Sequence, residues 1–173
     1  MGRVWWILLG LVVACVLQCI AAPALVLFGA QPNFMLIFAL AYAATRQDDS
    51  ALLVAFFAGL LYDLMGVMPL GFDAVLFTLG ALVVYKSCTW FGAEDPQSQL
   101  VFTLGTLILL ELAYLAFGVF ACHAAMLGAL VRCLVCLGLD ALLLVVCKPL
   151  VRILYGSSEP ARPSFSGVID NFR

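Results

Sequence analysis

The chain has 173 residues, of which 66% are hydrophobic and only 10% are charged, and its formal net charge at pH 7 is −2. Soluble domains carry about 25% charged residues and about half apolar ones, so this chain has too little polar material to cover a water-soluble globule. The composition argues against an aqueous enzyme, and the charge provides no broad basic field for nucleic acid. We therefore expect an all-α fold, a polytopic integral membrane helical bundle.

Six apolar segments separated by turn residues predict about six transmembrane helices. A membrane-crossing helix needs about 20 apolar residues, and the continuous Leu, Val and Ala runs lack the alternation over about 10 residues that marks a membrane β-barrel strand. Pro32 is placed at the beginning of the second helix, where its missing N–H costs nothing. The predicted spans are 4–28, 34–45, 50–66, 72–85, 100–122 and 124–147.

The two ends of the chain are predicted to differ in structure. The first span resembles a signal peptide, but no small-x-small cleavage site follows it, so we expect a retained helix. Residues 1–155 then form the transmembrane domain. The Pro- and Ser-rich residues 156–173 are expected to form a disordered cytoplasmic tail.

The distribution of basic residues predicts the orientation, because cationic loops stay in the cytoplasm. With six crossings and a cytoplasmic N-terminus, the opposite loops hold no Lys or Arg, and the C-terminus is cytoplasmic as well. Only Arg132 falls inside a span. The basic residues on the cytoplasmic side are Arg3, Arg46, Lys86, Lys148, Arg152, Arg162 and Arg173.

Two of the predicted spans have only about a dozen uninterrupted apolar residues, 34–45 and 74–85. Such a helix is about 18 Å long, which is shorter than the hydrocarbon thickness. Re-entrant half-helices are one explanation, and short full spans shielded by longer neighbours are the other. We favour shielding, because the charged cluster at 46–49 must reach water.

Five ionisable residues lie within or at the rim of the spans, where a charge costs about 2.5–3.5 kcal/mol and needs a partner. Glu111 and Arg132 both lie about 15–17 Å from the turn that joins the last two spans, so an ion pair between them is predicted. Arg132, Cys136 and Asp140 have four-residue spacing and form a polar stripe that faces the bundle interior. The stripe is either a clamp between helices or a contact for a partner or ligand.

Asp63 and Asp73 flank one outer turn. Two close carboxylates that share a proton would resemble an acid protease, whereas two helix caps near water would be structural, and we favour the caps. Asp140 is expected on the inner side of the membrane, too far from Asp63 to complete such a pair.

The sequence gives no support for a cofactor, a metal site or a catalytic centre. Cys133 and Cys136 have the C-x-x-C spacing but lie in an apolar helix, and the single histidine, His123, is expected at its outer turn, so the cysteines are interpreted as apolar filler. No ATP-binding, zinc-protease or serine-hydrolase motif is present. Small residues around Gly59 and Gly80 indicate close helix packing, either within the core or in a groove for a partner helix.

The stretch 57–76, FAGLLYDLMGVMPLGFDAVL, resembles the signature of the MreD family of bacterial rod shape-determining membrane proteins. That signature has a Gly-Leu-x-x-Asp helix end, a short turn ending in Pro/Thr-Leu-Gly, and another helix. The chain length, the helix number, Pro32-Asn33 and the closing stretch 148–152 are also similar. The resemblance implies that the residues most worth testing are Gly59, Asp63, Pro69 and Gly71.

The resemblance implies a non-catalytic scaffold of the cell-elongation complex, which makes peptidoglycan, in the bacterial plasma membrane. Its partners would be an MreC-like single-span protein and a RodA-type glycan polymerase with its transpeptidase. The family's suspected kinship with energy-coupling-factor transporters implies an alternative, a vitamin-binding membrane subunit, which would need an outward-facing polar cavity. An enzyme such as lipoprotein signal peptidase would need paired Asn/Asp motifs that are missing here.

Overall fold

The computed structural model describes residues 2–46, 48–66, 69–91, 95–120 and 125–156. His123 and, apart from Gly156, the predicted tail lie outside these ranges. Within them, the predicted all-α fold is confirmed. The helices are α1 (Gly2–Ala24), α2 (Phe34–Thr45), α3 (Ser50–Met65), α4 (Phe72–Trp90), α5 (Pro96–Phe120) and α6 (Met126–Tyr155).

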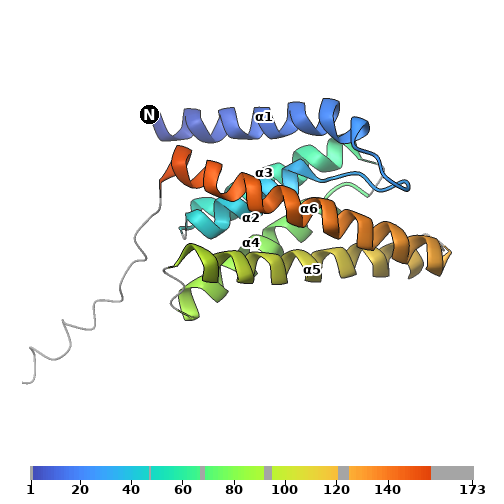
Figure 1. Cartoon of the computed structure of the whole chain (residues 1–173). Coiled ribbons are helices and arrows are strands. Elements are labelled where there is room, and N and C mark those ends of the chain that lie inside the picture. Colours follow the sequence, from blue (N-terminus) through green and yellow to red (C-terminus); the bar gives the residue numbers. More distant parts are fainter. Residues whose placement is uncertain (1, 47, 67–68, 92–94, 121–124, 157–173) are drawn as a thin grey trace, which may run out of the picture.

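The helices run up and down along one bundle, so that the N-terminus of α1 and the C-terminus of α6 lie at the same end (Figure 1). At this end Arg46 Nη1 donates to the Tyr155 carbonyl, and Lys148 Nζ donates to the Pro96 carbonyl at 2.7 Å. We call it the basic end. At the opposite end α1, α3 and α5 end and α2, α4 and α6 begin, and we call it the turn end.

The short helix α2 is the centre of the bundle. All of its 12 residues are buried except Phe38, which is half-buried, and it contacts the five other helices. A helix that is apolar on every face belongs in an interior. The arrangement supports shielding by longer neighbours as the explanation for its length of about 18 Å.

Several predicted helix ends are wrong, because the helices do not end at the last residue of each uninterrupted apolar run. α4 continues to Trp90 and is 19 residues long, so it is not a short helix. α6 continues through Pro149 to Tyr155. α1 ends earlier than predicted, at Ala24, because Leu27 and Ala30 pair through two backbone hydrogen bonds around a turn.

The role predicted for Pro32 belongs to another proline. Pro32 precedes α2 rather than beginning it, since Phe34 is the first helical residue and Asn33 is the N-cap. Pro96, in contrast, is the first residue of α5, where a proline is well tolerated.

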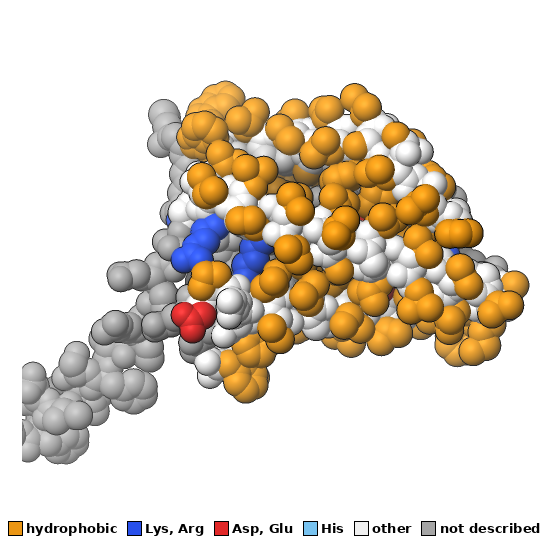
Figure 2. All heavy atoms as spheres, viewed as in Figure 1, with side chains coloured by type: hydrophobic (Ala, Val, Ile, Leu, Met, Phe, Trp, Pro, Cys, Tyr) orange, Lys and Arg blue, Asp and Glu red, His pale blue; other side chains and the backbone are white. Residues whose placement is uncertain are grey.

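The outer surface is predominantly apolar, as a lipid-facing bundle requires. Within the described part of the chain, four helices are long and apolar enough to cross a membrane: α1 from Val4, α4, α5 and α6. Figure 2 shows hydrophobic side chains over most of one face, with Lys and Arg gathered near the basic end. The predicted helical membrane bundle is confirmed.

The small residues are used inside the bundle. A Cβ atom added at Gly80 would lie 2.7 Å from Leu110 Cδ1, and Ala55, Ala58 and Ala81 are fully buried. Of the two interpretations of the small residues, the structure supports the packed core.

Candidate functional site

The signature stretch forms a tight junction between α3 and the N-terminus of α4. Asp63, which is 4% exposed, accepts three backbone hydrogen bonds: from Gly71 and Ala74 at Oδ2 (3.0 and 3.1 Å) and from Asp73 at Oδ1 (3.0 Å). A helix begins with N–H groups that have no intrahelical acceptor, and a carboxylate there is favourable. Asp63 is therefore a cap, as favoured, but it caps the neighbouring helix.

Two glycines of the signature make this junction possible. Gly59 lies one helical turn before Asp63 on the same face, and a Cβ atom there would lie 2.5 Å from both Ala74 Cα and the Asp73 carbonyl oxygen. Gly71 is the N-cap of α4 with a φ of +94°, a conformation that favours glycine. Having no side chain, Gly71 leaves the capping role to Asp63.

Pro69 has a simpler role in the turn. Its side chain is exposed, and its carbonyl accepts a hydrogen bond from the Phe72 N–H at 3.1 Å. This bond and the three to Asp63 supply acceptors for the first N–H groups of α4.

The geometry does not support a protease-like aspartate pair. Both Asp63 oxygens already accept backbone N–H groups, while the fully buried Asp73 accepts the Tyr114 hydroxyl at its Oδ1. The two carboxyl groups are neighbours, but each is held by a different set of donors.

A second aspartate supports the N-terminus of α2. Asp140 Oδ1 accepts the Asn33 N–H at 2.9 Å, and Asn33 Oδ1 caps α2 by accepting the Leu36 N–H at 3.0 Å. Gln18 from α1 accepts the Phe34 N–H at 2.8 Å and donates to the Pro32 carbonyl at 3.3 Å. The first N–H groups at α2 thus have three different side-chain acceptors, whereas at α4 the side-chain acceptor is Asp63.

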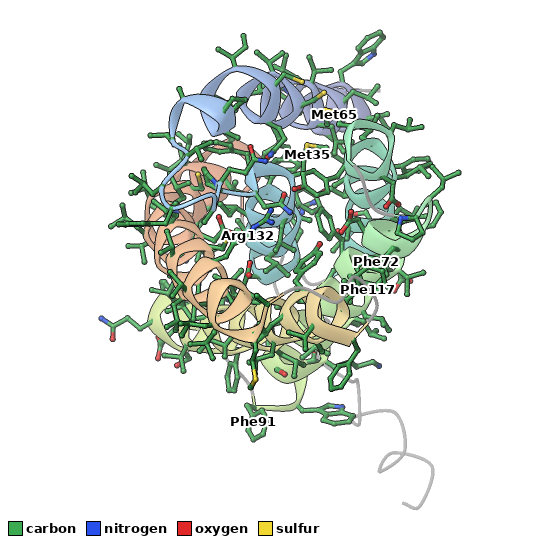
Figure 3. The ribbon with its side chains drawn as sticks, turned by 90° about the vertical axis from the view of Figure 1, so that its right-hand side faces the viewer. Met35, Met65, Phe72, Phe91, Phe117 and Arg132 are labelled. Carbon is green, nitrogen blue, oxygen red and sulfur yellow. The ribbon has the colours of Figure 1, made fainter. Side chains whose placement is uncertain are left out.

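Between these two helix beginnings lies a polar cavity of about 390 Å³ that reaches from the α5–α6 turn into the bundle. Asp140 is 12 residues beyond Gly128 on α6, or about 18 Å along the helix. Figure 3 views the molecule from the turn end, where Arg132 projects from α6 toward the enclosed space. The polar residues lining the cavity are Gln31, Asn33, Tyr62, Asp73, Glu111, Tyr114, Arg132, Cys133, Cys136 and Asp140.

The polar stripe on α6 lies along this cavity, as its spacing predicts, with Arg132, Cys136 and Asp140 all in the lining. The predicted ion pair between Glu111 and Arg132 does not form. Glu111 and Arg132 both line the cavity, but no contact within 4 Å joins their charged groups, and the Glu111 carboxyl has Asp140 as well as Arg132 among its electrostatic neighbours. Depth along two helices gave the correct level but not the direction of each side chain.

Two carboxylate oxygens in the cavity wall have no hydrogen-bond partner among the described residues. They are Oδ2 of Asp73 and Oδ2 of Asp140, on residues that are 0% and 1% exposed. Buried polar atoms without partners are uncommon and need an explanation.

Cys133 and Cys136, interpreted as filler, donate to the carbonyls of Glu111 and Gln31 at 3.6 and 3.7 Å.

Sequence reasoning missed four residues of these sites: Gln18, Asn33 as a cap, Tyr62 and Tyr114. Gln18 is an isolated polar residue within an apolar span, and Tyr114 lies three residues after Glu111, on the same helix face. Both signals were readable from the sequence. Tyr62 had no comparable signal, because tyrosine is common at membrane interfaces.

Comparison with known families agrees with the signature at the α3–α4 junction. The family model described as rod shape-determining protein MreD matches residues 2–157. The chain belongs to the MreD family. Neither the curated proteins nor the solved structures contain a significant match. MreD proteins are shape-determining structural membrane proteins, so membership assigns this chain a role in rod shape determination.

Proposed function

We propose that this MreD protein is a non-catalytic, multi-pass scaffold in the bacterial plasma membrane. It binds an MreC-like single-span protein and links it to a RodA-type glycan polymerase and its transpeptidase. The observation that carries the proposal is the family match over residues 2–157, which covers all six helices.

An apolar groove between α1, α2 and α6 supports docking of a partner span. It has a volume of about 200 Å³, and its walls include Leu9, Val13, Leu17, Leu150 and Leu154, each at least 40% exposed. The wall from Leu9 to Leu17 follows α1 for about 12 Å. Helices associate in membranes through close packing of such surfaces, so an apolar helix is the occupant we assign to this groove.

Co-purification with the MreC-like protein of the same organism tests the scaffold and the groove together. The wild-type protein should retain the partner in mild detergent, whereas Val13→Trp should fill the groove and reduce recovery several-fold. Leu109→Trp is the matched control, because Leu109 is 56% exposed on α5 and lies outside the groove.

The outcomes separate two claims. If the folded wild-type protein recovers no MreC-like partner, the scaffold proposal is wrong. If Val13→Trp and Leu109→Trp retain the partner equally, the scaffold stands and the groove assignment is wrong.

The polar cavity favours a second candidate function, a substrate-binding subunit of an energy-coupling-factor type vitamin transporter. Such a subunit requires a cavity with several polar groups, which is present here. Repeated recovery of an ATPase module in place of the MreC-like protein would favour this candidate.

A further inference from the structure

We propose that the polar cavity is a binding site for a small zwitterionic ligand, with a primary ammonium group at the neighbouring carboxyl groups of Asp140 and Glu111 and an anionic group at Arg132. Two sources provide this chemistry: the headgroup of phosphatidylethanolamine and free compounds such as phosphoethanolamine. The site is separate from the apolar groove, and the inference does not depend on which partner docks there.

The first support is the pair of unpartnered oxygens. Asp73 and Asp140 each use Oδ1 to hold a protein donor, Tyr114 and the Asn33 N–H, while their Oδ2 atoms accept no N–H or hydroxyl group from the described residues. Both residues line the cavity and are buried. Each aspartate has a second carboxyl group beside it, that of Asp63 for Asp73 and that of Glu111 for Asp140. A ligand that brings N–H donors into the cavity supplies the missing hydrogen bonds.

The second support is the balance of charge. The lining holds three carboxyl groups, of Asp73, Glu111 and Asp140, and one guanidinium, that of Arg132. Glu111 and Asp140 are neighbours within hydrogen-bonding reach, and two carboxylates at close range are unfavourable unless they share a proton or a cation lies between them. A cationic group is the complement that this arrangement favours.

The carboxyl groups favour an organic cation over a metal ion. Across the described ranges, no three His, Cys, Asp or Glu side chains are grouped closely enough to hold a metal ion. The carboxyl groups are instead distributed along α4, α5 and α6 beside the Tyr62 and Tyr114 rings. Aromatic rings are favourable neighbours for an ammonium group.

Arg132 accounts for the anionic part of the ligand. It lies two helical turns nearer to the turn end than Asp140, lines the same cavity, and forms no ion pair within 4 Å among the described residues. Guanidinium groups bind phosphate and carboxylate through paired hydrogen bonds. The ligand therefore enters with its ammonium group first, and its phosphate or carboxylate stays at Arg132.

The cavity has the size of a small-molecule site. Its volume of about 390 Å³ falls within the range of about 300–1,000 Å³ for ligand pockets. Gly128 lines it near the turn end, and a Cβ atom added there would meet nothing within 4 Å. A bulky side chain at residue 128 can occupy the cavity without a clash in the helix.

Native mass spectrometry and calorimetry of the purified full-length protein test the proposal in two arms. In the lipid arm, protein in nanodiscs with equal phosphatidylethanolamine and phosphatidylglycerol should retain phosphatidylethanolamine preferentially. In the soluble arm, protein in detergent without phosphatidylethanolamine is titrated with phosphoethanolamine. Preferential retention assigns the lipid as the source, and saturable binding of phosphoethanolamine alone assigns a free zwitterion.

Variants connect the binding to the cavity. Asp140→Asn keeps the acceptor for the Asn33 N–H, removes the charge, and should weaken binding by about tenfold or more, since hydrogen bonds to charged groups are the strong ones. Gly128→Phe should abolish binding. Gly138→Phe is the matched control, because Gly138 is on the same helix, has equally open surroundings and does not line the cavity.

The proposal is overturned if neither probe binds to the wild-type protein. It is equally overturned if binding occurs but Asp140→Asn and Gly128→Phe bind as well as Gly138→Phe. A protein that binds the zwitterion but no MreC-like partner would retain this site and lose the scaffold function.

Discussion

Asp63 and Asp140 are both buried aspartates that support the beginning of a neighbouring helix, yet their surroundings differ. Asp63 uses both oxygens on three backbone N–H groups of one short segment, and it is the side-chain acceptor for the α4 N-terminus. Asp140 uses one oxygen on the Asn33 N–H, shares the α2 N-terminus with Gln18 and Asn33, and keeps Oδ2 unpartnered in the cavity. The comparison indicates that a fully bonded buried carboxylate serves the fold, whereas a half-bonded one has capacity for a ligand.

The largest effect is expected at Gly59, where α3 and α4 make backbone contact. Gly59→Leu should destabilise the bundle by about 3 kcal/mol or more, because its Cβ atom would lie 2.5 Å from backbone atoms that cannot move aside. Thermal unfolding in detergent measures this loss. Gly105→Leu is the control, since nothing lies within 4 Å of a Cβ atom there, and equal behaviour of the two variants would show that the helices are not in contact as described.

A smaller but clear loss is expected when the Asp63 carboxylate becomes an amide. Asp63→Asn keeps one acceptor oxygen and turns an NH2 group toward backbone donors, so at least one buried N–H loses its partner, at a cost of about 1–3 kcal/mol. Insertion into the membrane should persist, while stability and recovery of the MreC-like partner fall. Wild-type stability of this variant would mean that the three N–H groups find other acceptors.

Gln18→Leu tests whether the α2 N-terminus is held by several side chains. Removing the two hydrogen bonds of Gln18 leaves the buried Phe34 N–H and the Pro32 carbonyl without this partner and should cost about 1–3 kcal/mol. The loss should not exceed that for Asp63→Asn, because Asp140 and Asn33 still accept the N–H groups of Asn33 and Leu36. A loss larger than that of Asp63→Asn, measured by the same unfolding experiment, would reverse the proposed contrast.

Asp140→Asn should have the smallest effect on stability, below about 1 kcal/mol, because its remaining oxygen still accepts the Asn33 N–H and the new NH2 group replaces an oxygen that accepts no N–H or hydroxyl group from the described residues. Unfolding in detergent without added zwitterion measures the stability alone. A loss equal to that of Asp63→Asn would mean that Asp140 is a structural cap of the same kind.

The sequence allowed much of the architecture to be predicted. Apolar runs and turn residues gave the six helices, and the level of Glu111 and Arg132 along their helices placed both beside one cavity. The prediction of a Glu111–Arg132 ion pair is wrong because the position of a residue along its helix does not specify the direction of its side chain. The predicted ends of α4 and α6 are wrong because residues beyond them, Cys88 in α4 and Val151 in α6, are buried against the bundle and continue the helix.

The signature residues show a second limit of sequence reasoning. Four-residue spacing places Gly59 and Asp63 on one face of α3, but the partner of that face is fixed only when the chain reverses through Pro69 and Gly71. The backbone contact between Gly59 and Ala74, and the three N–H groups that reach Asp63, are therefore visible only in three dimensions.

Hydrogen–deuterium exchange of the segment 69–75 tests the role of Asp63 most directly. In the wild-type protein the amides of Gly71, Asp73 and Ala74 should exchange slowly, since each donates to a buried carboxylate. Asp63→Asn should accelerate exchange across this segment, and Asp140→Asn should leave it at the wild-type rate. Rapid exchange in the wild-type protein, or equal acceleration in both variants, would contradict the distinction between the two aspartates.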